Sequence, residues 1–241
     1  MKGLILALQF LTRLPLPRID ADAADFAASM RWFPAAGLIV GLLVAGGARL
    51  GVTIDAWTGA LFALATWVLV TGALHLDGLA DITDAAGAAH KGRERLLAVL
   101  SDPHVGGFGV VAVALQLIAK LVLLHGLLAN DVSVAALALV PAIARVGPIA
   151  WTLWLPPLHE GLAARFRPAA RSMHLVLWTA ILCAAALWCA PALLVAILLV
   201  PLWAWRVRRT IGGISGDGHG AGIELVETGL LLALLIGAHS T

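Results

Sequence analysis

Charged residues are scarce in this chain. Only 12% of its 241 residues are charged, whereas 61% are hydrophobic, and the mean hydropathy is +0.96. A soluble globular domain carries about 25% charged residues, so this chain lacks the polar surface that would cover a soluble core. The scarcity excludes a soluble enzyme, a disordered chain and a nucleic-acid-binding protein. It predicts an all-α polytopic membrane protein that forms a single domain over residues 1–241.

Familiar reactive groups are also missing. The only two cysteines, Cys183 and Cys189, lie in one apolar run. Six residues apart on a helix they point in different directions, so we interpret them as packing residues, not as a metal site or a disulfide. The glycine-rich segment 212–222 lacks the GKS or GKT end of a Walker loop. No Ser/His/Asp or Cys/His nucleophile set is evident, so any attacking group is expected to come from a substrate.

Long apolar runs predict six or seven membrane-spanning helices, each of which needs about 20 mostly apolar residues. The segment 3–14 is too short to span and is expected to be interfacial or re-entrant. Pro191 alone separates the fifth run from the sixth, which leaves the count between six and seven. The predicted runs are Phe33–Val52, Trp57–Leu79, Val105–Leu128, Val132–Leu155, His174–Ala190, Ala192–Trp205 and Gly222–Ala238.

Basic residues gather on one side of a seven-span topology. Cytoplasmic loops of membrane proteins carry an excess of Lys and Arg, so this side is predicted to face the cytoplasm across the inner membrane. Arg49 is the basic residue of the opposite face. The residues of the basic side are Lys2, Arg13, Arg18, Arg31, Lys91, Arg93, Arg95, Arg165, Arg167, Arg171, Arg206, Arg208 and Arg209.

Three aspartates close the second apolar run at helical spacing. Asp77, Asp81 and Asp84 follow an i, i+4, i+7 pattern, which places them within about 60° of one another on a helix. Stacked carboxylates repel unless a cation lies between them, and hard oxygen ligands suit Mg²⁺. Because a carboxylate at membrane depth is costly, function is the default hypothesis. A solvated helix end with ordinary capping acids is the alternative.

Acids also precede the third and the last runs. Asp102 is predicted either to cap the third helix or to act as a fourth metal ligand, and the glycines after it, from Gly106, suit an anion held by backbone N–H groups. Asp217, Glu224 and Glu227 fall within about 80° on a helix and form a second candidate set of metal ligands. The alternative for them is stabilisation by the helix N-terminus.

Other residue types border these acids. Arg145 lies near the middle of the fourth run and is expected to face the bundle interior and engage a carboxylate or phosphate, whereas Lys120 is expected to snorkel. Asp77, Asp81 and Asp217 are the candidate catalytic residues. The candidate substrate-binding residues are His75, Gly78, His104, Gly106, Arg145, Arg209, Ser215 and Gly216.

This inventory is typical of a membrane phosphoryl or phosphate-ester transferase. Acids would hold metal ions, which bridge phosphates and neutralise the charge that develops in the transition state. Glycines and arginines would hold the remaining oxygens. Attack would come from a substrate hydroxyl, with a carboxylate as the candidate base.

The motifs resemble the cobalamin synthase family, the adenosylcobinamide-GDP ribazoletransferases, over residues 4–235. They are Phe10–Pro17, Trp32-Phe-Pro with Gly37 and Gly41, His75-Leu-Asp-Gly-Leu-Ala-Asp81 with Asp84, Asp102 with its glycine-rich turn, and Gly212–Asp217 with Gly220, Ala221 and Glu224. The family usually has Thr where Ser215 stands, Leu where His219 stands and Asp-Ser at 102–103. The segment 156–172 matches poorly, and we assign nothing there.

The resemblance implies an inner-membrane enzyme of vitamin B12 synthesis that requires Mg²⁺. It would join adenosylcobinamide-GDP to α-ribazole, or to its 5′-phosphate, and release GMP. The sequence leaves open whether it forms a homo-oligomer or associates with other cobalamin-assembly enzymes. A CDP-alcohol phosphotransferase of phospholipid synthesis is one alternative, although Asp81 stands where those enzymes have Arg. A transporter is another, although its carboxylates would lie near the bilayer midplane.

Overall fold

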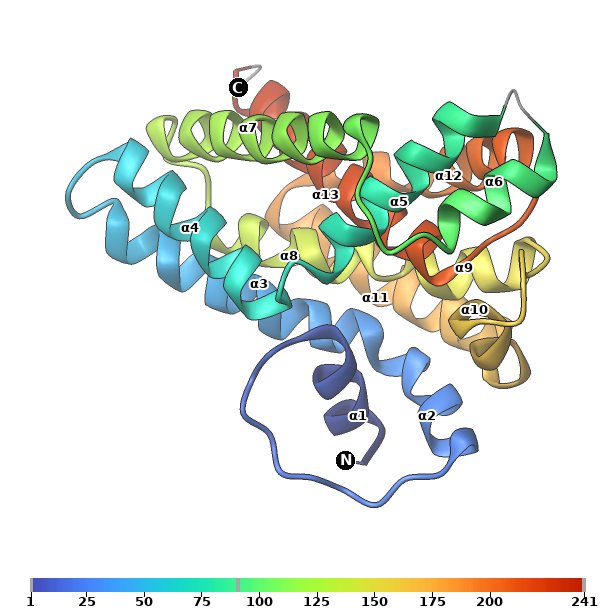
Figure 1. The fold of residues 1–241 in the computed structure, drawn as a ribbon. Coiled ribbons are helices and arrows are strands. Elements are labelled where there is room, and N and C mark those ends of the chain that lie inside the picture. The colour runs from blue at the N-terminus through green and yellow to red at the C-terminus, as the bar shows by residue number, and fades with distance from the viewer. Residues whose placement is uncertain (1, 90–91, 240–241) are drawn as a thin grey trace.

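The computed structural model describes residues 2–89 and 92–239 and consists of helices and connecting loops (Figure 1). Lys91, which the sequence analysis counts on the basic side, lies outside the described residues. The helices are α1 (Lys2–Leu11), α2 (Ala23–Ser29), η1 (Met30–Trp32), α3 (Phe33–Gly51), α4 (Ala56–Thr71), α5 (Leu74–Ala88), α6 (Arg93–Leu100), α7 (Gly107–Ala129), α8 (Val134–Ala144), α9 (Gly147–Trp154), α10 (Leu162–Phe166), η3 (Arg167–Ala169), α11 (Ser172–Cys189), η4 (Pro191–Val195), α12 (Ala196–Thr210) and α13 (Gly216–Ala238).

Six described helical segments are long and apolar enough to cross a membrane, or seven if α4 and α5 count as one broken span. This confirms the predicted all-α, multi-pass architecture and its count. The predicted continuous span Trp57–Leu79 is wrong, because α4 and α5 meet at an angle of 83°. Gly72 and Ala73 between them have φ angles of 61° and 58°. Left-handed residues of this kind end an α-helix, and α5 leaves in a new direction.

Glycines bring α3 and α8 into close contact. A Cβ atom at Gly37 would collide with the carbonyl oxygen of Pro141, and one at Gly41 with that of Ala138. Helices in a bilayer associate through such small residues, since lipid tails provide little hydrophobic drive for association. The two glycines are four residues apart and lie on one face of α3, so this face is the seam against α8.

The N-terminal segment forms a lobe below the bundle in the view of Figure 1, where a long loop joins α1 to α2. Its ten-residue helix α1 is apolar but short. The lobe is attached through an aromatic cluster of Phe10, Phe26, Phe33 and Phe166, whose rings contact one another with centroids 5.1–5.8 Å apart. The cluster joins the start of α3 to α10, and its residues Phe10, Phe33 and Phe166 line the site described below.

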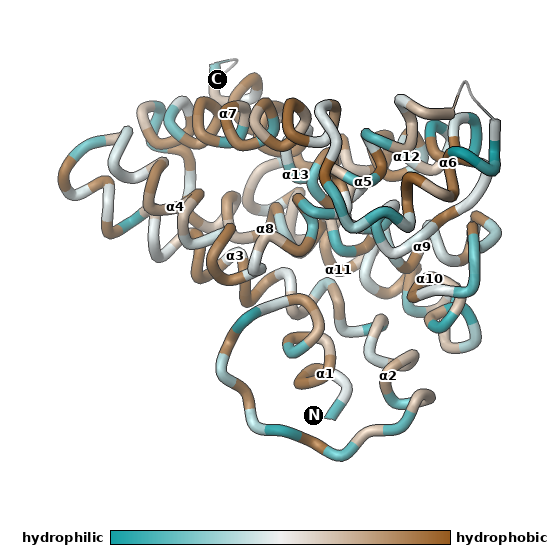
Figure 2. The backbone as a smooth tube through the Cα atoms, in the orientation of Figure 1, coloured by the Kyte–Doolittle hydropathy of each residue, from teal (hydrophilic) through white to brown (hydrophobic). Residues whose placement is uncertain are grey.

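Polar residues collect at one end of the molecule. Figure 2 shows hydrophilic residues around α5 and α6, whereas α7 is mostly hydrophobic. Helices α6 and α10 and the end of α12, which carry predicted basic-side arginines, lie at this end in Figure 1. The loop between α3 and α4 lies at the opposite end. The bundle therefore has one polar end, where α5 and the start of α13 also lie.

Candidate active site

Helix α13 begins in the glycine-rich segment. The sequence analysis places the last span at Gly222–Ala238, but the helix already starts at Gly216, with Ser215 as its N-cap. The Ser215 side chain accepts a hydrogen bond from the Gly218 amide at 3.0 Å, which satisfies one of the free N–H groups of the first turn. The glycines are helical because neighbouring elements pack closely on them: a Cβ at Gly222 would collide with Trp151 and Trp203.

The acids of α5 and α13 meet at the polar end. Gly78 of α5 lies so close to the backbone of Asp217 that a Cβ there would be 2.8 Å from the Asp217 carbonyl oxygen. Asp81, which is half-buried, interacts electrostatically with Asp77, Asp84 and Asp217. A glycine allows another group to approach closely, and the group that approaches Gly78, a candidate substrate-binding residue, is this backbone. The three candidate catalytic aspartates thus form one group.

A pocket opens beside these acids and has a cavity volume of about 70 Å³. Its polar lining is His75, Asp77, Asp217 and His219, and we call it the acidic pocket. The rest of its wall is apolar and includes Phe10, Leu11, Phe33, Leu74, Pro148, Leu162, Phe166, Gly216, Gly220 and Ile223. The carboxylates of this lining suit a hard cation, and its phenylalanines suit an apolar or aromatic group.

Asp84 binds the N-terminus of α7. Its two carboxylate oxygens accept hydrogen bonds from the backbone amides of Gly106, at 2.7 Å, and Gly109, at 3.0 Å. The predicted anion site at these glycines is therefore filled by the chain's own carboxylate. An acid at this position also interacts favourably with the helix dipole. Because both oxygens are engaged, we place Asp84 outside the proposed metal site, although its charge acts on Asp81.

Asp102 lies in the loop before α7 and is exposed. It accepts hydrogen bonds from the backbone N–H of His104 at 3.0 Å and from its ring Nδ1 at 2.8 Å. The N–H and the ring of His104 hold the pKa of the Asp102 carboxyl below its usual range. Asp102 is not the cap of α7, whose N-cap is Gly106, so the capping prediction is wrong.

The candidate substrate-binding residue Arg209 is exposed on α12, and its guanidinium lies over the ring of Trp205.

Glu224 and Glu227 belong to a buried ion cluster, not to the surface of the pocket. Lys120 of α7 binds both carboxylates, at 2.7 Å and 2.6 Å, and Arg145 binds Glu227 at 2.8 Å. Gln116 donates to Glu224 and to Thr228. All four charged side chains are at most 4% exposed. We call this group of Gln116, Lys120, Arg145, Glu224, Glu227 and Thr228 the ion cluster.

The ion cluster confirms one expectation and changes two others. Arg145 faces the bundle interior and pairs with an acid, as predicted. The expectation that Lys120 snorkels is wrong, because two carboxylates hold it inside, with Trp67 4.3 Å away. Glu224 lies seven residues beyond Asp217, or about 10 Å along the helix. With both glutamates engaged by cations, we leave them out of the proposed metal site.

The remaining acids have the chemistry of a Mg²⁺ site without being a complete one. Within residues 2–89 and 92–239, no lysine or arginine forms an ion pair with Asp77, Asp81 or Asp217, and no three His, Cys, Asp or Glu side chains are already arranged around a common point. Mg²⁺ commonly binds through one or two carboxylates together with substrate phosphates and water. The donor set therefore fits a metal that arrives with a phosphorylated substrate.

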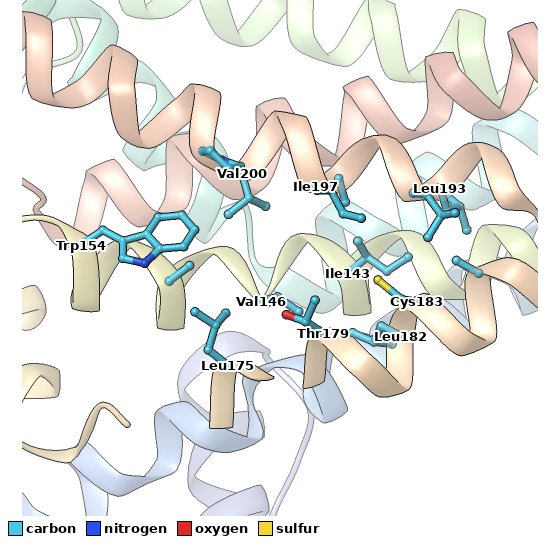
Figure 3. Close-up of a pocket in the computed structure, with 15 residues that line it drawn as sticks. Ile143, Val146, Trp154, Leu175, Thr179, Leu182, Cys183, Leu193, Ile197 and Val200 are labelled. Atoms are coloured by element: carbon cyan, nitrogen blue, oxygen red, sulfur yellow. The ribbon is translucent and has the colours of Figure 1, made fainter. Parts of the chain in front are cut away.

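An apolar cavity lies elsewhere, between α11, α12 and the α8–α9 segment (Figure 3). Its volume is about 260 Å³. Leu175, Thr179 and Cys183 line it from α11, and Ile197 and Val200 from α12. Its lining includes no charged side chain among the described residues, so it offers nothing that would bind a phosphate or a metal.

Several residues of the pocket carried no sequence signal of their own. Phe166 and Leu162 belong to the segment 156–172, to which the sequence analysis assigns nothing. Phe10 and Phe33 lie inside motifs quoted for the family resemblance, but no chemistry marked them as site residues. His219 is different, because the sequence makes it a further candidate to touch substrate although it departs from the family pattern; its ring Nε2 lies within hydrogen-bond distance of Thr152 Oγ1, at 3.2 Å.

Comparison with known proteins identifies relatives over nearly the whole chain. The family model described as cobalamin-5-phosphate synthase matches residues 3–235. A protein of Novosphingobium aromaticivorans named adenosylcobinamide-GDP ribazoletransferase is 64% identical over 98% of this chain and 97% of its own length. Proteins with the same name from Thiobacillus denitrificans and Pseudomonas putida are 50% and 36% identical, over 96% and 97% of this chain and 94% and 98% of their own lengths. No solved structure matches the chain.

The matches extend through α1, the acids of α5 and the start of α13. They agree with the predicted resemblance and favour it over the CDP-alcohol phosphotransferase and the transporter. This chain is a transferase of cobalamin biosynthesis that belongs to the cobalamin-5-phosphate synthase family.

Proposed function

We propose that the acidic pocket transfers adenosylcobinamide phosphate from adenosylcobinamide-GDP to α-ribazole or its 5′-phosphate, with release of GMP. The observation that carries the proposal is the meeting of Asp77, Asp81 and Asp217 from two helices beside one pocket with apolar walls. A ribose hydroxyl of the acceptor attacks the cobinamide-linked phosphorus. The bond from that phosphorus to the bridging oxygen of GMP breaks, and GMP leaves with that oxygen.

The chain's own residues then have distinct tasks. Asp77 and Asp217 line the pocket and would hold Mg²⁺, with Asp81 behind them. When bound, Mg²⁺ neutralises charge on the transferred phosphate and on the leaving GMP. One of the three carboxylates accepts the proton of the attacking hydroxyl. The phenylalanine wall excludes water from the reacting group, which limits hydrolysis of the diphosphate.

The experiment is a turnover assay of the purified protein in detergent or liposomes. It contains adenosylcobinamide-GDP and α-ribazole, with Mg²⁺ or with EDTA, and mass spectrometry follows GMP and the cobalamin product. We expect both products with Mg²⁺ and neither with EDTA. Equal turnover in EDTA would remove the metal from the proposal. No product from folded protein under either condition would overturn the reaction, and release of CMP from a CDP-alcohol would identify the alternative.

We further propose that the polar end faces the cytoplasm across the inner membrane. The arginines of α6, α10 and α12 lie at that end, and such residues are enriched in cytoplasmic loops. Asp131, in the loop between α7 and α8, would then face the opposite side. With Cys183 and Cys189 replaced, an impermeant maleimide added to intact cells should label Asp131→Cys but not Gly161→Cys. The reverse pattern would invert the orientation.

A further inference from the structure

His75 connects the ion cluster to the acidic pocket. Its side chain is 3% exposed, and it lines the pocket together with Asp77 and Asp217. On the other side, its ring Nδ1 lies 3.4 Å from Nη2 of Arg145. Two residues before the first aspartate of α5, it thus lines the pocket and also lies within hydrogen-bond distance of a side chain of the ion cluster.

Arg145 fixes which ring nitrogen of His75 carries a proton. A guanidinium has only N–H donors and no acceptor, so Nδ1 of His75 must accept. The ring then carries its proton on Nε2. Arg145 itself cannot turn away, because its Nη1 donates to Glu227 at 2.8 Å and to the carbonyl oxygen of Pro141 at 3.0 Å. The chain Glu227–Arg145–His75 therefore orients an Nε2–H donor.

That donor has no partner within the described part of the chain. Nε2 of His75 is among the few buried polar side-chain atoms there that lack a hydrogen bond. A buried donor without an acceptor destabilises a fold, and such an exception in a folded protein calls for a specific explanation. An acceptor supplied by a ligand in the acidic pocket would remove the penalty.

We propose that His75 Nε2–H donates a hydrogen bond to a phosphate oxygen of the diphosphate substrate, with Arg145 as its positioning residue. This inference rests on the proposed function. Asp77 and Asp217 present only negative charge to the same pocket. A neutral, directional donor from a buried ring binds a phosphate oxygen while leaving the carboxylates free for metal and proton. The ion cluster thereby acts on the reaction through one oriented hydrogen bond, in addition to holding the helices together.

Three substitutions of His75 test the donor. Gln retains an N–H near the position of Nε2, Asn places its amide near Nδ1, and Phe has no donor. We expect His75→Phe and His75→Asn to lose about 10²-fold in kcat/KM for adenosylcobinamide-GDP, the scale of losing one donor to a charged oxygen. His75→Gln should recover most of that loss, while the KM of α-ribazole stays the same in all three. His174→Gln, on α11, is the control and should match the wild type.

A substrate-free measurement tests the orientation. Ring ¹⁵N NMR of His75 should show a proton on Nε2 and none on Nδ1 in the wild type, assigned by its loss in His75→Gln. Arg145→Leu combined with Glu227→Gln removes the positioning chain and leaves the Lys120–Glu224 pair intact and neutral. This double variant should show both tautomers and an activity close to that of His75→Phe. A proton on Nδ1 in the wild type would overturn the inference.

The outcomes separate the inference from the proposed function. If the wild type releases GMP and His75→Phe keeps wild-type kcat and KM, the donor role is wrong and the reaction stands. If Gln is no better than Asn or Phe, His75 acts through packing and the inference fails. If folded wild type forms no product, the proposed function fails, whatever the NMR result.

Discussion

Lys120→Met is the sharpest test of the ion cluster. Lys120 is 3% exposed and binds two glutamates. Its loss leaves Glu227 paired with Arg145 alone and removes the cation that pairs with Glu224 among the described residues. Removing one partner of a buried ion pair costs about 3–5 kcal/mol, because a charge is left uncompensated. For a chain of this length, about 2–4 °C in Tm corresponds to 1 kcal/mol. Lys120→Met should therefore lower Tm by about 6–20 °C.

Thermal unfolding in detergent at one fixed scan rate measures the effect. Tryptophan fluorescence is a suitable probe, because Trp67 lies over the Lys120 ammonium. Lys120→Met combined with Glu224→Gln restores neutrality, since Arg145 and Glu227 remain paired. This double variant should recover most of the lost stability.

Lys2→Met is the matched control, since Lys2 forms an exposed pair with Asp25 and exposed pairs contribute little. Its Tm should stay close to that of the wild type. The reasoning is refuted if Lys120→Met is as stable as Lys2→Met. It is also refuted if the double variant is no more stable than Lys120→Met alone.

Two further predictions concern packing and helix capping. Gly41→Val should destabilise the fold by about 1–3 kcal/mol, the usual cost of overpacking, because its Cβ would collide with Ala138. Gly46→Ala is the control: it has open space around it and should leave Tm unchanged or slightly higher. Equal Tm values for the two variants would contradict the α3–α8 seam. Asp84→Ala should lower the stability of the fold by about 0.5–2 kcal/mol, as for loss of a helix N-cap. It should also speed hydrogen exchange of the backbone amides of Gly106 and Gly109. Unchanged exchange would show that Asp84 does not hold the start of α7.

Much of the architecture follows from hydropathy alone. The apolar runs predict the spans because every backbone group in the bilayer must be hydrogen-bonded within a helix. The break at Gly72 and Ala73 escapes this logic, since apolar residues continue on both sides of it within the predicted run 57–79 and only the backbone angles end α4. The early start of α13 escapes it because glycine disfavours a helix intrinsically, and packing against Trp151 and Trp203 overrides that preference.

Part of the site can likewise be predicted from the sequence, and part of it depends on tertiary packing. The spacing of Asp77 and Asp81 predicts their common face, because that depends only on helical periodicity. The approach of Asp217 to Gly78 depends on tertiary packing, which a single sequence does not encode locally. The position around the helix axis also groups Glu224 with Asp217, but this angle takes no account of how far apart the two residues lie along the axis. The sequence of α7 alone predicts that Lys120 snorkels, because its partners Glu224 and Glu227 lie more than 100 residues away in sequence.

The most direct test of the central claim is the rate of GMP release, as a function of Mg²⁺ concentration, for Asp77→Asn, Asp217→Asn and the double variant. If α5 and α13 build one metal-dependent site, each single variant should lose most of its activity and need a higher Mg²⁺ concentration. The double variant should then be only slightly less active than the less active single variant, as for residues that act as a unit. Asp131→Asn, at an exposed loop residue with φ of 51° that Asn readily adopts, should behave like the wild type. A single variant with wild-type rate and Mg²⁺ dependence, or losses that simply multiply in the double variant, would contradict the shared site.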